Sequence, residues 1–271
     1  MRVVNIKPRP GARFLIGLVP IVVILIVYAI LAAARLEANP NDKVLPTFSA
    51  MGQAVAQFAT QVDPRTDQIT AWSDTIASLY RLGIGVAIAT FATLLIGIAL
   101  GVVPLVRAAL GPLVAIIAVI PPIAVLPILF IAMGLGEASK IALIALGIAP
   151  FMIRDLAAHV AGLPVEQMIK AQTLGANSWQ LTLRVALPQA LPRLIDSLRL
   201  SMGPAWVFLI SAEAIASDVG LGYRIFLVRR YLAMDIILPY VAWISLLAIA
   251  TDALLLLISR KAFPWAHGGQ P

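Results

Sequence analysis

The chain has 271 residues, of which 61% are hydrophobic and only 12% charged, with a formal net charge of +7. A soluble domain carries about 25% charged residues, and several apolar runs here reach the roughly 20 residues with which an α-helix crosses a bilayer. These values exclude an ordinary soluble enzyme and predict an all-α integral membrane protein. The absence of cysteine excludes disulfides and thiol chemistry.

The basic residues do not indicate a nucleic-acid partner, because many of them lie at the ends of apolar runs, as the positive-inside rule predicts. The two histidines, His159 and His267, stand far apart and have no partners at ligand spacing. No metal site is therefore predicted.

The first apolar run covers residues 14–34. It is longer than the core of a secretory signal, usually about 7–15 residues, although small residues at its end would suit cleavage. A first membrane helix is the favoured interpretation. In the polar segment that follows, Phe48, Met51, Val55 and Phe58 recur at helical spacing and predict a short amphipathic helix at the surface.

Further spans are predicted over residues 75–103, 108–133, 141–153, 191–216 and 236–259. Small residues in the second span should let neighbouring helices approach closely; they are Gly83, Gly85, Gly97 and Gly101. The third span contains four prolines, among them Pro121 and Pro122, and is expected to bend and to face the bundle interior. Pathway lining and a simple packing kink both remain open for it.

Six spans place both termini on one side of the membrane. That side would hold twelve of the twenty basic residues, so the positive-inside rule predicts that both termini are cytoplasmic. The polar, helix-forming segment 166–192 would face the cytoplasm too. Gly175 breaks its helical pattern and Leu187-Pro188 is expected to stop it, which predicts two short helices joined by a turn at Gly175.

This segment resembles the cytoplasmic coupling loop of ABC importer permeases, whose pattern is Glu-Ala-Ala-x-x-x-Gly followed by Ile-x-Leu-Pro. The residues that fall in register are Ala171, Gly175, Val185, Leu187 and Pro188. Ile169 and Lys170 stand where the pattern has Glu and the first Ala, and the nearby Glu166 is a possible substitute for the family carboxylate.

A wider resemblance covers residues 72–265. The residues that carry it are Gly175-Ala176-Asn177-Ser178-Trp179-Gln180, Leu187-Pro188-Gln189-Ala190-Leu191-Pro192, Leu198-Arg199-Leu200, Ala212-Glu213, Gly220-Leu221-Gly222-Tyr223, Asp252 and Phe263-Pro264-Trp265. In this order they resemble the permease branch that serves nitrate, sulfonates, taurine, bicarbonate, cyanate and some vitamin precursors.

The resemblance implies a six-helix type I permease of a bacterial inner membrane. Residues 1–71 would form an N-terminal membrane helix and an extracytoplasmic segment, 72–261 the type-1 transmembrane domain with its coupling loop at about 160–190, and 262–271 a cytoplasmic tail. Two copies would form a homodimer with two ATP-binding subunits and an extracytoplasmic solute-binding protein. The chain lacks the Gly-Lys dipeptide of the usual phosphate-binding loop, so ATP and Mg would belong to the partner, with no cofactor and no enzymatic activity here.

By this resemblance, the residues expected to couple the permease to its ATPase are Ala171, Leu174, Gly175, Ala176, Trp179, Leu187 and Pro188. The candidates for the solute pathway or a gate are Pro121, Pro122, Asp196, Arg199, Ser201, Ser211, Glu213 and Asp252. Charged residues inside spans are costly and therefore functional candidates. Asp196 and Arg199 can pair at their spacing of three, and Arg81 can pair with Asp252 or Glu213 if their depths match.

Three other functions are weighed. A stand-alone secondary transporter or channel would leave the pattern around Gly175 without a purpose, and no internal repeat supports an inverted-repeat carrier. A membrane-embedded enzyme would need a cluster of catalytic side chains that the sequence does not offer. A permease of another type I branch, for phosphonates, methionine, polyamines or a vitamin precursor, also stays open.

Overall fold

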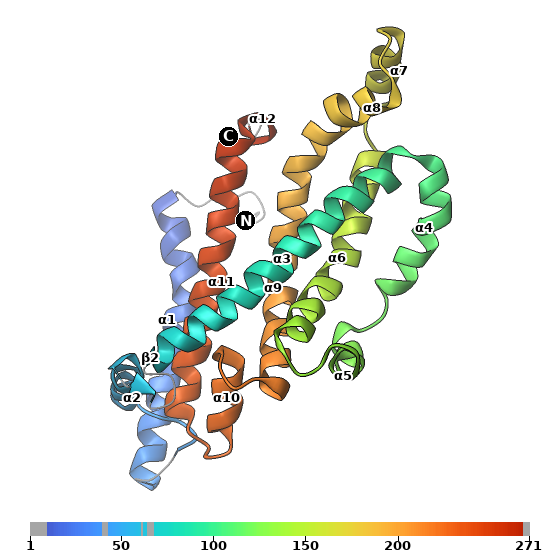
Figure 1. Cartoon of the computed structure of the whole chain (residues 1–271). Coiled ribbons are helices and arrows are strands. Elements are labelled where there is room, and N and C mark those ends of the chain that lie inside the picture. The colour runs from blue at the N-terminus through green and yellow to red at the C-terminus, as the bar shows by residue number, and fades with distance from the viewer. Residues whose placement is uncertain (1–9, 40–42, 61, 64–67, 268–271) are drawn as a thin grey trace.

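The computed structural model describes residues 10–39, 43–60, 62–63 and 68–267, and they are almost entirely helical (Figure 1). The helices are α1 (Pro10–Ala38), α2 (Phe48–Thr60), α3 (Thr70–Val102), α4 (Pro104–Ile117), α5 (Pro122–Met133), α6 (Glu137–Ala161), α7 (Val165–Thr173), α8 (Ser178–Leu181), the π-helix η2 (Thr182–Ala186), α9 (Leu187–Ala216), α10 (Leu221–Arg229), α11 (Met234–Ala262) and α12 (Pro264–His267). Two short strands, β1 (Val62–Asp63) and β2 (Gln68–Ile69), pair antiparallel.

Within the described ranges, five helices are long and apolar enough to cross a membrane, and α4 with α5 makes a sixth, bent span. The predicted all-α membrane architecture is thereby confirmed. The third span is bent, as predicted: α4 and α5 meet at 94° across a break of four residues. Pro121 and Pro122 cause this break: the first precedes α5 in extended backbone and the second occupies its first turn, where a missing N–H costs nothing.

The helices α3 and α6 form the most closely packed pair of the bundle. Gly85 and Gly101 of α3 face Ile144 and Val160 of α6, and a Cβ atom at Gly101 would lie 2.5 Å from the Cβ of Val160. The predicted close approach is therefore confirmed, but not for Gly83, whose added Cβ would meet nothing within 4 Å. At Gly85 and Gly101, α3 and α6 thus lie too close together for any side chain larger than hydrogen.

The helix that contains α8 continues through η2 into α9, so the prediction that Leu187-Pro188 stops it is wrong. Proline in an α-helix leaves the carbonyl four residues earlier without a donor. Here the wider π-turn lets the Leu187 N–H bind the Thr182 carbonyl, and Pro188 lies in the first turn of α9. The π-turn thus accommodates the proline without ending the helix.

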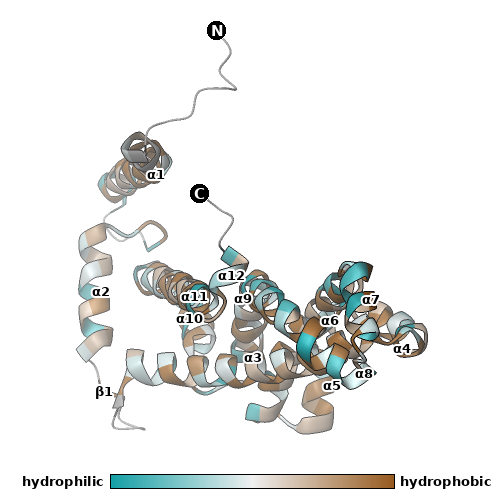
Figure 2. Cartoon of the chain, turned by 90° about the horizontal axis from the view of Figure 1, so that it is seen from above, coloured by the Kyte–Doolittle hydropathy of each residue, from teal (hydrophilic) through white to brown (hydrophobic). Residues whose placement is uncertain are grey.

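Helix α1 stands away from the main bundle (Figure 2). It contacts the segment before α2 through Tyr28, whose hydroxyl donates to the Pro46 carbonyl at 2.6 Å and whose ring lies 5.4 Å from that of Phe48. The predicted amphipathic helix is present as α2. Figure 1 shows that α11 ends, and α1 begins, toward the end of the bundle that carries α7 and α8.

Candidate functional site

The segment α7–α8 projects from one end of the bundle (Figure 1). Its turn forms where the Gly175 N–H donates to the Gln172 carbonyl at 2.9 Å and the Ala176 N–H to the Ala171 carbonyl at 3.0 Å. These two bonds are a Schellman motif, and Gly175 has the left-handed φ of +82° that it requires. The predicted turn between two short helices is confirmed, and Ala171 contributes its carbonyl to it.

Two large apolar side chains are exposed on this projecting tip. Leu174 is 80% exposed and Trp179 69%, on either side of the Gly175 turn. A capping box fixes the start of α8: the Gln180 N–H donates to Asn177 Oδ1 at 2.8 Å, and the Asn177 N–H to Gln180 Oε1 at 3.0 Å. The tip is therefore a well-defined backbone that presents two large apolar side chains away from the bundle.

One polar contact joins the tip to α9, and a second joins α9 to α6. Gln189 of α9 donates to Gln167 of α7 at 2.9 Å, and Arg193 of α9 binds Asp155 of α6 through two nitrogens, one at 2.9 Å. Leu187 lies apart from Leu174 and Trp179, half-buried against the main core. Leu187 and Pro188 thus belong to the root of the tip rather than to its exposed surface.

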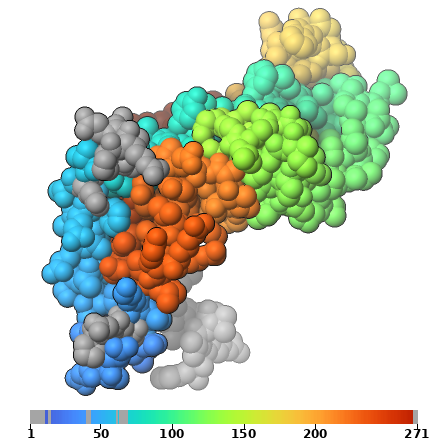
Figure 3. Space-filling model, turned by 60° about the horizontal axis from the view of Figure 1, so that its bottom comes forward, coloured from blue at the N-terminus to red at the C-terminus, as the bar shows by residue number. Residues whose placement is uncertain are grey.

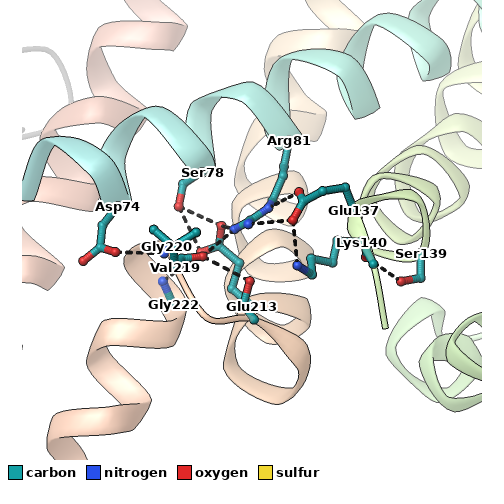
Figure 4. Close-up of polar contacts among 12 residues, drawn as sticks. Asp74, Ser78, Arg81, Glu137, Ser139, Lys140, Glu213, Val219, Gly220 and Gly222 are labelled. Atoms are coloured by element: carbon teal, nitrogen blue, oxygen red, sulfur yellow. Dashed lines mark hydrogen bonds and ion pairs between the residues drawn. The ribbon is translucent and has the colours of Figure 1, made fainter. Parts of the chain in front are cut away.

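A buried polar network holds the opposite end of the bundle, at the start of α10 (Figure 4). Three successive backbone N–H groups there find side-chain acceptors at 2.9 Å: Gly220 binds Asp74, Leu221 binds Ser78, and Gly222 binds Glu213. The first N–H groups of any helix lack partners within the helix, and its N-terminus attracts negative charge. The two carboxylates therefore satisfy and stabilise the first turn of α10.

Arg81 of α3 connects this network to α6. Its guanidinium, 2% exposed as a residue, donates to Glu213 at 2.6 Å, to the Val219 carbonyl at 2.8 Å and to Glu137 at 2.5 and 2.9 Å. Lys140 donates to Glu137 at 2.9 Å. Arg81 and Lys140 thus balance Glu213 and the partly exposed Glu137, and Arg224 balances Asp74 at 2.8 Å. Such pairing offsets the cost of removing ions from water.

Of the predicted ion pairs, one is present in the structure and one is not. Arg81 pairs with Glu213, one of its two expected partners. The pairing of Asp196 with Arg199 is wrong, because Arg199 binds Asp252 of α11 at 2.9 and 3.0 Å. Sequence separation does not reveal such contacts between helices, and it likewise gave no role to Asp74, Ser78, Glu137 or Lys140 in the network.

Comparison with known proteins agrees with these features. The sequence profile of the family described as "Binding-protein-dependent transport system inner membrane component" matches residues 93–263. The taurine transport system permease protein TauC of Escherichia coli (strain K12) is 36% identical over 199 residues, which are 73% of this chain and 72% of TauC. The chain belongs to this family. It is a membrane-spanning ABC importer permease.

Other relatives of the permease have related names. The nitrate import permease protein NrtB of Leptolyngbya laminosa is 27% identical over 73% of this chain and 71% of its own length. An aliphatic sulfonates transport permease protein, SsuC of Bacillus subtilis (strain 168), is 31% identical over 70% and 69%. An inward-facing structure of the MetNI methionine ABC transporter has the same fold, with a TM-score of 0.56 and 18% identity over 69% of this chain and 97% of its own.

The permease has a cavity of about 290 Å³ beside the break between α4 and α5. Pro122 and Ser201, two of the predicted pathway residues, line it together with Phe208, Leu146 and other apolar side chains. Ser211 does not line this cavity; like Ser201, it donates to the carbonyl four residues earlier in α9. The other charged candidates lie elsewhere: Glu213 is enclosed in the α10 network, and Asp252 with Arg199 forms a partly exposed pair between α9 and α11.

Proposed function

We propose that the α7–α8 tip is the docking site for a partner ATPase that drives this permease. The observation that carries the proposal is the exposure of Leu174 and Trp179 on a rigid turn outside the bundle. Large apolar side chains in such a position suit a groove on another protein, since buried aromatic anchors supply much of the energy of an interface.

The contacts of the tip suggest how its movement reaches the membrane. A displacement of α8 is carried along the continuous helix into α9, and the contacts Gln167–Gln189 and Asp155–Arg193 join that motion to α7 and α6. Ser201 lies on α9 beside the cavity. A rigid-body movement of these packed helices would therefore change the cavity's walls, as in other two-state domain motions.

The assembly would contain two copies of this chain, two ATP-binding subunits that carry ATP and Mg, and an extracytoplasmic binding protein. The tip would face the cytoplasm of a bacterium and α10 the outside, in agreement with the bias in basic residues. Because relatives are named for taurine, sulfonates and nitrate, we propose a small anion of this kind as the solute.

The test uses Gly175→Val, with Gly175→Asn as the matched control, in membranes from which the tagged permease is purified with its partners. Valine is β-branched and disfavours the left-handed backbone at this position, whereas asparagine tolerates it. We expect Val, but not Asn, to reduce solute uptake and solute-dependent ATP hydrolysis, with normal insertion of both.

A second pair of substitutions tests the surface itself. Leu174→Ser with Trp179→Ser removes the two apolar side chains and leaves the backbone of the turn in place. We expect the ATPase subunit to be lost during purification. Undiminished co-purification, or uptake into liposomes by the chain alone without ATP, would refute the docking proposal and favour a stand-alone transporter.

A further inference from the structure

The loop that follows α10, residues 229–232, is the second exposed tip of the molecule and lies at the end opposite α7 and α8 (Figure 1). Tyr231 is 70% exposed and Leu232 58%. The exposed Arg229 places its guanidinium 4.7 Å from the ring centroid of Phe226. Within the described part of the chain, neither Arg229 nor Arg230 has an ion-pair partner.

The backbone of this tip is strained at Leu232. The Leu232 N–H donates to the Arg229 carbonyl at 3.1 Å and the Ala233 N–H to the Val228 carbonyl at 3.5 Å. This is the same Schellman arrangement as at Gly175, but leucine occupies the glycine position with φ of +54°. Among the described residues it is the one non-glycine with positive φ, a conformation that costs about 1–2 kcal/mol. Strain of this kind is concentrated at functional sites.

The network around Arg81 fixes the start of α10, the helix that leads to the 229–232 tip. Asp74, Ser78 and Glu213 hold the first turn of α10, and Arg224, one turn further along, binds Asp74 at 2.8 Å. The nine-residue helix therefore presents its last residues from a fixed base. A binding surface that is already ordered loses less conformational entropy when it binds.

The tip's charge points to the kind of partner. If α10 faces outward, as the proposed function places it, Arg229 and Arg230 lie on the side where membrane proteins carry fewer basic residues. The two exposed arginines can bind carboxylates. Beside them, Tyr231 and Leu232 offer large side chains that can anchor in an apolar recess. Figure 3 shows the orange surface of the α10 region in the middle of this face, between the blue α2 and the green start of α6.

We propose that the 229–232 tip is the contact of this permease for the soluble solute-binding protein that delivers its substrate. The complementary surface of that protein carries Asp or Glu side chains around an apolar recess that receives Tyr231 and Leu232. This inference rests on the proposed function, because it needs the outward orientation of α10.

The test places a photo-crosslinking amino acid at Tyr231 in cells that express the full chain, with the same probe at the exposed Tyr80 of α3 as the control position. We expect a crosslinked adduct with the probe at position 231 but not at position 80. Mass spectrometry of the adduct should identify an exported solute-binding protein. That protein, purified, should bind the detergent-solubilised permease in a salt-dependent manner, and Arg229→Glu with Arg230→Glu should weaken binding by about tenfold or more. Arg260→Glu with Lys261→Glu, at the end of α11, is the matched charge reversal and should leave it unchanged.

Leu232→Gly separates a docking role from a structural one. Glycine relieves the strain but removes the apolar side chain, so thermal stability should not fall while affinity for the binding protein does. Adducts with lipid or with a second copy of the chain, or unchanged affinity in the arginine variants, would overturn the inference. If the ATPase co-purifies and the Gly175 variants behave as expected, these outcomes refute only the role of residues 229–232. If the Gly175 test fails, the proposed function is refuted, and the inference that rests on it is refuted too.

Discussion

Replacing Arg81 by methionine tests whether the network of Figure 4 is a matched set of charges. The change removes the cation that binds Glu213, which is 0% exposed, while Asp74 keeps its pair with Arg224. Breaking a buried pair in this way costs about 3–5 kcal/mol. At roughly 2–4 °C per kcal/mol for a large chain, the midpoint of thermal unfolding should fall by the order of 10 °C.

The double variant Arg81→Met with Glu213→Gln distinguishes charge from packing. Glutamine keeps the shape of the side chain but needs no counter-ion, and Glu137 retains Lys140 at 2.9 Å. We therefore expect the double variant to recover most of the lost stability, a non-additivity typical of residues in contact.

The assay heats the purified protein in one detergent and measures the fraction that stays monodisperse by size-exclusion chromatography. A single variant that melts within about 2 °C of the unmodified protein would refute the cost assigned to the unpaired carboxylate. A double variant no more stable than the single one would show that the loss came from the arginine's packing.

Two further predictions concern stability measured in the same way. Gly101→Ala should lose about 1–3 kcal/mol through overpacking against Val160, whereas Gly83→Ala, with open space around it, should not be destabilised; equal losses would contradict the assignment of the α3–α6 contact. Asp252→Asn should cost about 1 kcal/mol or less, because the Arg199–Asp252 pair is partly exposed, and a loss as large as that of Arg81→Met would contradict this ranking.

The membrane spans and the turn at Gly175 could be predicted from sequence because their causes are local. Apolar length decides a span, and a glycine at a helix end supplies the left-handed backbone of a Schellman motif. The span predicted over residues 75–103 is α3 (Thr70–Val102), with errors confined to its ends. Local pattern is sufficient wherever the partner of a residue is the bilayer or its own helix.

Contacts between distant helices could not be predicted in this way. Arg81 and Glu213 are 132 positions apart, and Arg199 binds a residue of α11 rather than the nearby Asp196. Helix α10 was missed because its first turn, in a polar and glycine-containing stretch, is stabilised by side chains of α3 and α9. The depth and rotation of each helix decide these pairs, and both are properties of the assembled bundle.

The π-helix η2 has a consequence for the direction in which Trp179 points. An α-helix turns by about 100° per residue, and a π-turn is a local widening that holds additional chain. Because a π-turn takes one more residue than an α-turn to complete about the same rotation, deleting one residue from Thr182–Ala186 would restore α-helical winding and leave Trp179 on nearly the same side of the helix. Deleting one residue from the regular part of α9 would instead rotate Trp179 by about 100° about the axis of α9. The π-turn therefore holds its extra residue without redirecting the α7–α8 tip, whereas the loss of one residue from α9 itself would present the tryptophan to a different neighbour.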